Sequence, residues 1–204
     1  MNRRVHAVIA FFAIISSLVG SVGLASADID HDELVPAQPR SDTPQVLDGI
    51  VWDTTRWNNM IIVGGDFAQV EDDGTIYDQA NLMAYDINTG NLITSFDPQI
   101  NGRIREVEVS EDGQSLFVGG AFNAVNGTTR KRLAKIRTNG NLVTAFNANV
   151  SSEVNGLALS GGKVYVGGSF LKVEGQPRSK LAAVDAVTGD LDTTFDLPIT
   201  GGIG

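Results

Sequence analysis

The chain has 204 residues, of which 42% are hydrophobic, and its 24 acidic and 15 basic residues give a formal net charge of -9 at pH 7. An acidic protein repels the phosphates of nucleic acids and the headgroups of anionic membranes, so the composition argues against both as partners. The absence of cysteine excludes disulfides, thiol catalysis and cysteine-ligated metals, so packing and strand pairing must stabilise the fold.

The first 27 residues predict a secretion signal. Arg3 and Arg4 precede a short apolar run that ends in an A-x-A sequence at residues 25–27. A basic start, an apolar centre and small residues at the end are typical of a cleaved signal peptide. We expect cleavage between Ala27 and Asp28 and a secreted or cell-surface protein that leaves the cell by the Sec route. A retained membrane anchor is the alternative, but the apolar run is shorter than the ~20 residues that a spanning helix needs.

Residues 28–45 predict a flexible leader. They combine an acidic cluster with three prolines and show little apolar periodicity. Without residues 1–27 the chain keeps all 24 acidic residues and 13 of its basic ones, for a net charge of -11. The acidic run around His31 is a weak candidate for a metal cluster, since chelation requires a fixed backbone.

The remainder of the chain repeats one phrase three times. Each unit contains an apolar run ending in Val-Gly-Gly-x-Phe and closes on another phenylalanine. The repeated positions are Gly64, Gly65, Phe67 and Phe96, then Gly119, Gly120, Phe122 and Phe146, then Gly167, Gly168, Phe170 and Phe195. The closing phenylalanines are 50 and then 49 residues apart. Self-similarity at a period of this length predicts a repeat architecture.

Each period contains four short β-rich runs separated by turn residues. In the middle unit the runs are Ile104–Val109, Ser115–Gly119, Leu133–Arg137 and Asn141–Phe146, and Asp112-Gly113 predicts a tight hairpin between the first two. Four antiparallel strands per repeat are the pattern of a β-propeller blade. The sequence therefore predicts an all-β fold, a partial β-propeller of about three four-stranded antiparallel blades within residues 46–204. The expected blades cover residues 46–97, 98–147 and 148–197, and a fourth begins at 198–204.

Three blades are fewer than the four to eight that close a propeller ring. The expectation is a fragment of a longer protein, with further blades in cis. Self-association of several copies is the alternative.

The Gly-Gly pairs have two interpretations. A phosphate-binding loop leads from a strand into a helix, whereas here each pair leads to phenylalanine and another strand. A structural role is favoured, in which glycine admits a close backbone approach and the phenylalanine packs between adjacent blades.

Few residues offer catalytic chemistry. The repeats contain neither histidine nor cysteine, so we expect no nucleophilic triad and no catalytic residue of these types. Glu106 and Glu108 lie on one face of a predicted strand and could form a catalytic carboxylate pair. The favoured interpretation is that they are solvated residues at the strand edge.

The first unit carries an acidic insertion four residues longer than its counterparts. Glu71, Asp72, Asp73 and Asp78 would form a compact acidic loop, and oxygen-rich loops can hold calcium. An ordinary acidic insertion is the favoured interpretation, because the spacing does not fit an EF-hand. No other cofactor is expected.

The repeated phrases resemble the delta-60 type repeat propellers of exported bacterial proteins and, more distantly, the Rax2-like surface propellers of fungi. The best match runs from Val118 to Arg130; the first unit departs from it, because it carries the insertion and lacks an arginine at the matching place. The turns at residues 86–90 and 185–189 are similar to those of quinoprotein propellers, which have tryptophan where this chain has Phe96 and Phe195. The resemblance implies export and surface display and supplies no shared catalytic residues.

These observations together predict a non-enzymatic module for surface display or for contact with an unknown protein or glycan. The alternative is part of a propeller enzyme, quinone- or carboxylate-dependent, whose site needs further blades. Variable loops on a rigid scaffold favour the first hypothesis.

Overall fold

The computed structural model describes residues 42–197. The expected cleavage site between Ala27 and Asp28, most of the expected leader and the expected start of a fourth blade at 198–204 lie outside these residues. The described residues form strands β1 to β16 and no helix, so the prediction of an all-β fold is confirmed. Residues 42–197 accordingly contain no helix that could cross a membrane.

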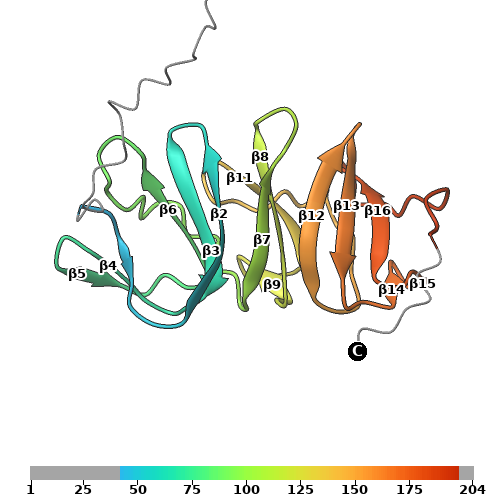
Figure 1. Ribbon diagram of the computed structural model, residues 1–204, viewed down its shortest axis with the longest axis horizontal. Coiled ribbons are helices and arrows are strands. Elements are labelled where there is room, and N and C mark those ends of the chain that lie inside the picture. The colour runs from blue at the N-terminus through green and yellow to red at the C-terminus, as the bar shows by residue number, and fades with distance from the viewer. Residues whose placement is uncertain (1–41, 198–204) are drawn as a thin grey trace, which may run out of the picture. The chain divides into compact units, whose positions relative to one another are not determined.

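Three antiparallel sheets follow one another along the chain, with their first strands β2, β7 and β12 side by side (Figure 1). Blade 1 consists of β2 (Ile50–Trp57), β3 (Met60–Asp66) and β6 (Leu82–Asp86). Blade 2 consists of β7 (Ile104–Val109), β8 (Ser115–Gly120) and β11 (Leu133–Arg137), and blade 3 of β12 (Val154–Ser160), β13 (Lys163–Gly168) and β16 (Leu181–Asp185). In each blade the middle strand pairs with both others.

The fourth run of each repeat is shorter than the sequence suggests. It pairs with the third strand through one bridge per blade, which joins Tyr85 to Leu92, Ile136 to Leu142, and Val184 to Leu191. A turn follows at once, and in blades 1 and 2 it is closed by hydrogen bonds from the amides of Phe96 and Phe146 to carbonyls three residues earlier. The turn directs these closing phenylalanines into the core, where both are fully buried.

A short hairpin lies between the second and third strands of every blade. The hairpins are β4 (Val70–Asp72) with β5 (Thr75–Tyr77), β9 (Ala124–Val125) with β10 (Thr128–Thr129), and β14 (Lys172–Val173) with β15 (Gln176–Pro177); β1 (Gln45–Val46) pairs with β4. Their two-residue turns are Asp73-Gly74, Asn126-Gly127 and Glu174-Gly175, all with positive φ. Such turns match the twist of the strands that they join.

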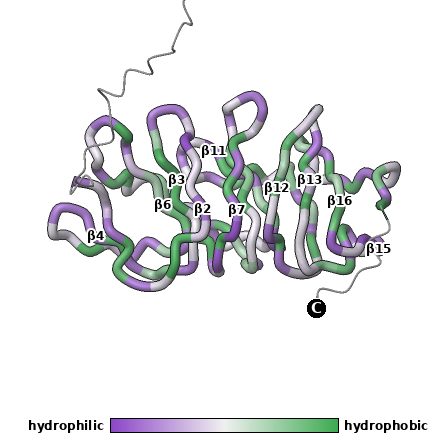
Figure 2. Tube along the Cα trace, in the orientation of Figure 1, coloured by the Kyte–Doolittle hydropathy of each residue, from purple (hydrophilic) through white to green (hydrophobic). Residues whose placement is uncertain are grey.

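Apolar side chains of adjacent blades form shared core clusters. Hydrophobic residues follow the strands, and the upper turns are mostly hydrophilic (Figure 2). Each blade has a leading face toward the preceding blade and a following face toward the next one. The following face of blade 1, with Ile62, Leu82 and Phe96, packs on the leading face of blade 2, with Ile104 and Leu116. The same arrangement recurs between blades 2 and 3. The hydrophobic core is therefore built from face-to-face contacts between repeats.

The two glycines of each Val-Gly-Gly phrase serve different contacts. A Cβ atom on Gly64 would lie 2.8 Å from Ile104 Cγ2, in the next blade. A Cβ atom on Gly65 would collide with the carbonyl oxygen of Ile50, in the first strand of its own blade. The first glycine thus admits the neighbouring blade, and the second admits the adjacent strand. Phe67, Phe122 and Phe170, which follow the glycine pairs, are all buried.

Candidate ligand-binding face

The first strand of each blade contains a β-bulge at the same place. The register of pairing with the second strand shifts between Val51 and Asp53, between Ile104 and Glu106, and between Val154 and Gly156. The bulges leave Trp52, Arg105 and Asn155 outside the ladder. A bulge changes the direction of the side chain at that position. The same bulge in three adjacent first strands therefore presents a different side chain in each blade.

Two of these bulge residues stack on each other. The Arg105 guanidinium carbon lies 3.8 Å from the ring centroid of Trp52, close enough for a cation–π interaction between blade 2 and blade 1. Residue Trp52 as a whole nevertheless remains 44% exposed. The stack therefore holds an aromatic ring in a fixed orientation while leaving part of it open to solvent.

The arginine side of this stack is fixed by Glu153 of blade 3. One carboxylate oxygen of Glu153 accepts hydrogen bonds from Nε of Arg103 and from Nε of Arg105, both at 2.8 Å. The two guanidinium groups, Arg103 first, lower the pKa of Glu153 to about 2 against the opposing effect of burial. Glu153 therefore stays ionised and orients Arg105 beneath the indole ring.

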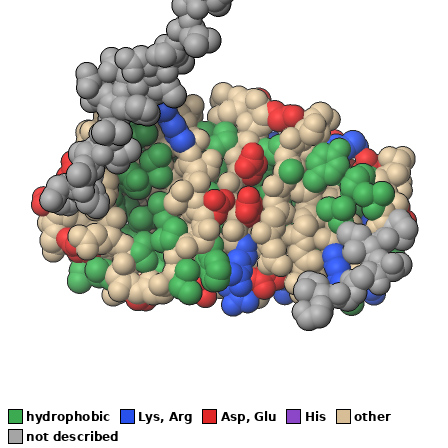
Figure 3. Space-filling view, in the orientation of Figure 1, with side chains coloured by type: hydrophobic (Ala, Val, Ile, Leu, Met, Phe, Trp, Pro, Cys, Tyr) green, Lys and Arg blue, Asp and Glu red, His purple; other side chains and the backbone are tan. Residues whose placement is uncertain are grey.

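Carboxylates lie next to the stack. Asp53 Oδ2 accepts a hydrogen bond of 2.8 Å from the Val107 amide, which joins blade 1 to blade 2. Burial, and then the nearby negative charge of Asp53, raise the pKa of Glu106 and of Glu108. Figure 3 shows acidic side chains gathered over the middle of the blade row, with basic side chains beside them. We call Trp52, Asp53, Arg105, Glu106 and Glu108 the Trp52 face.

The Trp52 face combines a partly exposed aromatic ring with carboxylate hydrogen-bond acceptors. This chemistry suits the binding of a ligand that has an apolar surface and hydroxyl or amide groups. Within residues 42–197, no group of three or more acidic or histidine side chains is placed to hold a metal ion.

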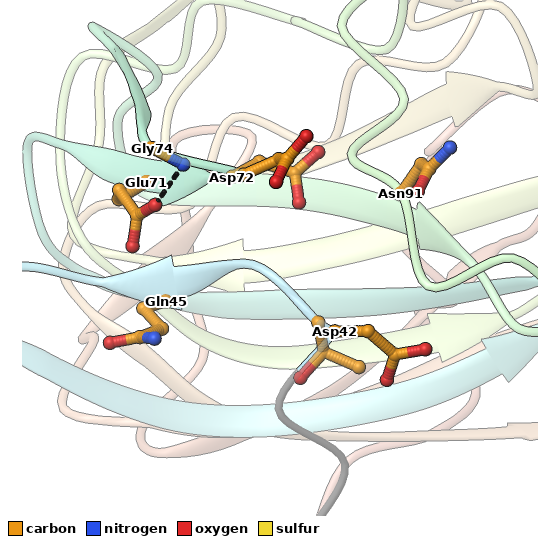
Figure 4. A pocket seen from close by; sticks show the side chains of 8 residues that line it. Asp42, Gln45, Glu71, Asp72, Gly74 and Asn91 are labelled. Atoms are coloured by element: carbon orange, nitrogen blue, oxygen red, sulfur yellow. Dashed lines mark hydrogen bonds between the residues drawn. The ribbon is translucent and has the colours of Figure 1, made fainter.

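The acidic insertion of blade 1, which the sequence predicts as a compact acidic loop, forms the hairpin β4–β5. Its four extra residues are divided equally between the two sides of the Asp73-Gly74 turn, so they lengthen the hairpin β4–β5 without changing the turn. Strand geometry then sends Glu71 and Asp72 in opposite directions (Figure 4). Glu71 accepts a hydrogen bond from the Gly74 amide, and Asp72 accepts one from the Leu92 amide. Asp78 binds the Gln69 side chain instead.

A hollow of about 520 Å³ lies beside this hairpin and is lined by Asp42, Gln45, Glu71, Asp72, Asp73 and Asn91, among others. Its lining is polar, and two of its carboxylates already accept backbone hydrogen bonds. The calcium prediction for Glu71, Asp72, Asp73 and Asp78 therefore remains a prediction, with no converging set of ligands to support it.

The position that lacks arginine in blade 1 is occupied by Gln79. In blade 2 the buried Arg130 donates a hydrogen bond to the Thr144 carbonyl, and in blade 3 Arg178 donates one to the Thr193 carbonyl. Gln79 Nε2 donates to the Phe96 carbonyl at 2.7 Å. Each of these side chains ties the segment before the third strand to the closing turn, so they have a structural role.

The carboxylates Glu106 and Glu108 were singled out from the sequence, and they lie in the Trp52 face. Sequence reasoning missed Trp52, Asp53, Arg105 and the supporting pair Arg103 and Glu153. A signal was present, because Trp52, Arg105 and Asn155 occupy one repeat position with unrelated side chains, between residues that repeat closely. A position that varies between repeats, although its neighbours repeat closely, is one whose side chain the fold does not determine.

Comparison with known proteins identifies the repeats. A family model described as "Domain of unknown function (DUF5122) beta-propeller" matches residues 115–146 and 160–195. No curated protein matches the chain. Among solved structures, the computationally designed Ika8 and Ika4 proteins are both 14% identical to it, with TM-scores of 0.46 and 0.48. The alignments cover 69% and 76% of this chain, and 35% of the Ika8 chain and 78% of the Ika4 chain. The fold is thus that of β-propeller repeats, and the matching segments of blades 2 and 3 fit a family model that carries no assigned function.

Proposed function

We propose that the chain is an exported, non-enzymatic β-propeller module, secreted or displayed at the cell surface, that contacts a glycan or a protein through the Trp52 face. The observation that carries the proposal is the exposed indole of Trp52, held in place by Arg105 at 3.8 Å. A ring that is fixed before binding loses little conformational freedom when a ligand packs on it.

The neighbouring groups suit a sugar best. The apolar face of a sugar ring can pack on the indole, while the carboxylates of Glu106 and Glu108 accept hydrogen bonds from its hydroxyl groups. Tryptophan and arginine are also the residues that dominate protein interfaces, so a protein segment is the other ligand class that the face would accept.

Tryptophan fluorescence provides the test. The chain has two tryptophans, Trp52 and the buried Trp57, so a ligand at the face should alter the Trp52 signal alone. A panel of soluble oligosaccharides and a panel of peptides would be titrated against the protein. Isothermal titration calorimetry measures binding by the variants, because Trp52→Ala removes the fluorescent probe. Binding by either panel is expected to be lost in Trp52→Ala and kept in Ile76→Ala, which changes another exposed hydrophobic residue away from this face. Equal binding by Trp52→Ala, or no binding by either panel, would refute the proposal.

Export rests on the A-x-A sequence that ends at Ala27 and on the resemblance to exported repeat propellers. Expression in a bacterial host followed by mass spectrometry of the secreted chain tests it. The expected mature N-terminus is Asp28. An intact N-terminus in a chain that stays inside the cell would contradict export.

The partly buried carboxyl groups of Glu106 and Glu108, two residues apart on β7, support a second candidate, a carboxylate-dependent hydrolase. A carboxyl group whose pKa is raised by burial can act as a general acid. Product analysis of the oligosaccharide titrations distinguishes the candidates. Hydrolysis that is abolished by Glu106→Gln or Glu108→Gln would support the enzyme, and stable oligosaccharides would support the binding module.

A further inference from the structure

One repeat position holds tryptophan in blade 1 and serine in the other two blades. Trp57, Ser110 and Ser160 each close the hairpin between the first two strands of their blade, opposite the first residue of the second strand. Because the strands around this position match, the side chain here decides what fills the adjoining space between one blade and the next.

Between blades 1 and 2 this space is filled by the indole of Trp57. The residue is only 1% exposed, and its ring lies edge to face with that of Phe96, with 6.4 Å between the centroids. Its Nε1 donates a hydrogen bond of 2.8 Å to the carbonyl of Gly113, in the first turn of blade 2. An aromatic ring with one hydrogen-bond donor is therefore what the molecule itself places between these two blades.

Between blades 2 and 3 the same space contains a hollow, because Ser110 is much smaller than tryptophan. The pair Phe117 and Lys135, where blade 1 has Ile62 and Ala84, refills part of the space. A hollow of about 170 Å³ with a mostly apolar lining is left. It lies among residues of both blades, including Ser110, Asp112, Phe117, Lys135, Leu159 and Val187.

The lining of this hollow favours an apolar ligand over an anion. On the side of blade 3, Leu159 is half-buried and Val187 is 67% exposed, so a ligand would remove apolar surface from water. The one cation of the lining is already held by the protein. Lys135 Nζ donates a hydrogen bond of 2.9 Å to the Ala186 carbonyl and lies 5.0 Å from the centroid of the Phe117 ring.

A hydrogen-bond acceptor is also present in the lining. Asp112 Oδ1 accepts hydrogen bonds from the Ser110 hydroxyl at 2.6 Å and from the Gln114 amide at 3.0 Å. These bonds, the hydroxyl first, lower the pKa of Asp112, so the carboxylate stays ionised. Its other oxygen accepts no hydrogen bond from residues 42–197. That oxygen is available to a donor on a ligand, as the Gly113 carbonyl is to the indole of Trp57.

We propose that the hollow between blades 2 and 3 binds a small aromatic compound with a hydrogen-bond donor, such as indole or phenol. The ring would take the place that Trp57 takes between blades 1 and 2. An apolar cavity of about 150 Å³ is large enough to bind benzene, so the volume of the hollow suits a small aromatic ring. The hollow shares no residue with the Trp52 face, so this site is independent of the proposed function.

Isothermal titration calorimetry of the purified full chain with indole and with phenol tests the proposal. Ligands of this size are expected to bind with a dissociation constant of about 0.1–1 mM. Cyclohexanol, which keeps the hydroxyl group of phenol and lacks the aromatic ring, should bind at least ~10-fold more weakly. Trp52→Ala should bind indole as the wild type does, which separates this site from the Trp52 face. The absence of binding by indole and phenol, or equal binding by cyclohexanol, would overturn the proposal.

Two substitutions of Ser110 locate the site. Both Ser110→Trp and Ser110→Ala remove the hydroxyl that accepts a hydrogen bond from the Ser115 amide, so they differ in whether the hollow is filled. Ser110→Trp should weaken indole binding at least ~10-fold, and Ser110→Ala should stay within ~2-fold of the wild type. Circular dichroism and thermal melting would establish that both variants are folded. Equal binding by the two variants would place indole elsewhere.

A charge at the rim of the hollow gives a second test that does not disturb the core. Val187→Asp should weaken indole binding at least ~10-fold, because it replaces an apolar contact by a hydrated carboxylate. Leu171→Asp is the matched control, since Leu171 is 65% exposed and lies outside the hollow, and it should leave binding unchanged. If Ser110→Trp does not fold, the comparison of these two variants decides, and equal binding by both would overturn the proposal.

Discussion

Gly119 of blade 2 lies directly beneath Val154 of blade 3, so that a Cβ atom added to the glycine would stand 2.7 Å from Cγ1 of the valine. Gly64 and Ile104 repeat this relationship between blades 1 and 2. Real Cβ atoms do not approach other atoms so closely, and the nearby Phe117 and Phe146 rings leave little room for adjustment. The absence of a side chain at this position therefore sets the distance between adjacent blades.

Gly119→Ala is expected to lower the free energy of unfolding by about 2–3 kcal/mol, because the added methyl group overpacks the contact between blades 2 and 3. Gly156→Ala is the matched control. No described atom lies within 4 Å of the Gly156 Cβ position, so its effect should stay within about 0.5 kcal/mol. Urea unfolding monitored by circular dichroism measures both. Equal effects of the two substitutions would count against the packing argument.

Glu153 is expected to make the free energy of unfolding fall as the solution becomes more acidic. Its pKa is lowered from the ordinary 4.5 to about 2 by Arg103 and Arg105, so the folded state binds the proton more weakly than the unfolded state. The stabilisation is complete above about pH 4.5 and is lost as the pH falls toward 2. Glu153→Gln should destabilise the protein by about 1–2 kcal/mol at pH 7, with a flatter loss of stability between pH 4.5 and 2.

Thermal melts of wild type and Glu153→Gln across this pH range would measure the effect. Glu111→Gln is a suitable control, because Glu111 also bridges blades 2 and 3 but binds only the backbone amides of Gly161 and Gly162. Parallel pH profiles for wild type and Glu153→Gln would show that the ion pairs do not contribute.

A small polar residue ties each short hairpin to the segment that precedes its blade. Asn101 Oδ1 accepts hydrogen bonds from the amides of Asn123 and Ala124, at 3.0 and 2.8 Å. Asp48 and Ser151 make the same pair of bonds in blades 1 and 3. Asn101→Ala should cost about 1 kcal/mol, and Asn101→Asp, which retains the accepting oxygen as Asp48 does, should cost less. Chemical denaturation of both variants tests this, and an equal loss in both would argue against the bonds.

Calcium is expected to leave the melting temperature unchanged. Glu71 and Asp72 point to opposite sides of the hairpin and already accept backbone hydrogen bonds, and Asp78 binds Gln69. A titration from chelator-treated protein to millimolar calcium measures the shift. A concentration-dependent rise that Asp72→Asn abolishes would establish a site at this hairpin.

The repeats were predictable because glycine, valine and phenylalanine recur wherever the same contact recurs. The strands Ile104–Val109 and Leu133–Arg137 begin and end where the sequence predicts. The run Asn141–Phe146 does not form a full strand, since the chain turns after one bridge at Leu142 to bury Phe146. Local β propensity cannot show this, because the burial of Phe146 depends on the next blade.

The Trp52 face was less accessible to sequence reasoning. Trp52 and Arg105 are brought together by bulges, and a bulge changes the face that a residue occupies without leaving a mark in the alternation of apolar residues. Arg103 and Glu153 are 50 residues apart, so their contact arises only from the stacking of blades 2 and 3. Substitution of arginine by Gln79 in blade 1 likewise becomes intelligible only when both side chains are seen to bind the closing turn.

The most direct test of the central claim, that the first glycine of each Val-Gly-Gly phrase admits a branched side chain of the next blade, is a double-mutant cycle between Gly119 and Val154. Gly119→Ala and Val154→Ala should each destabilise the protein, but truncation of the valine should relieve the overpacking caused by the alanine. The account predicts a coupling energy of about 1 kcal/mol or more, with the double variant more stable than the sum of the single effects implies. Additive effects would contradict it, because they would mean that the two residues do not meet.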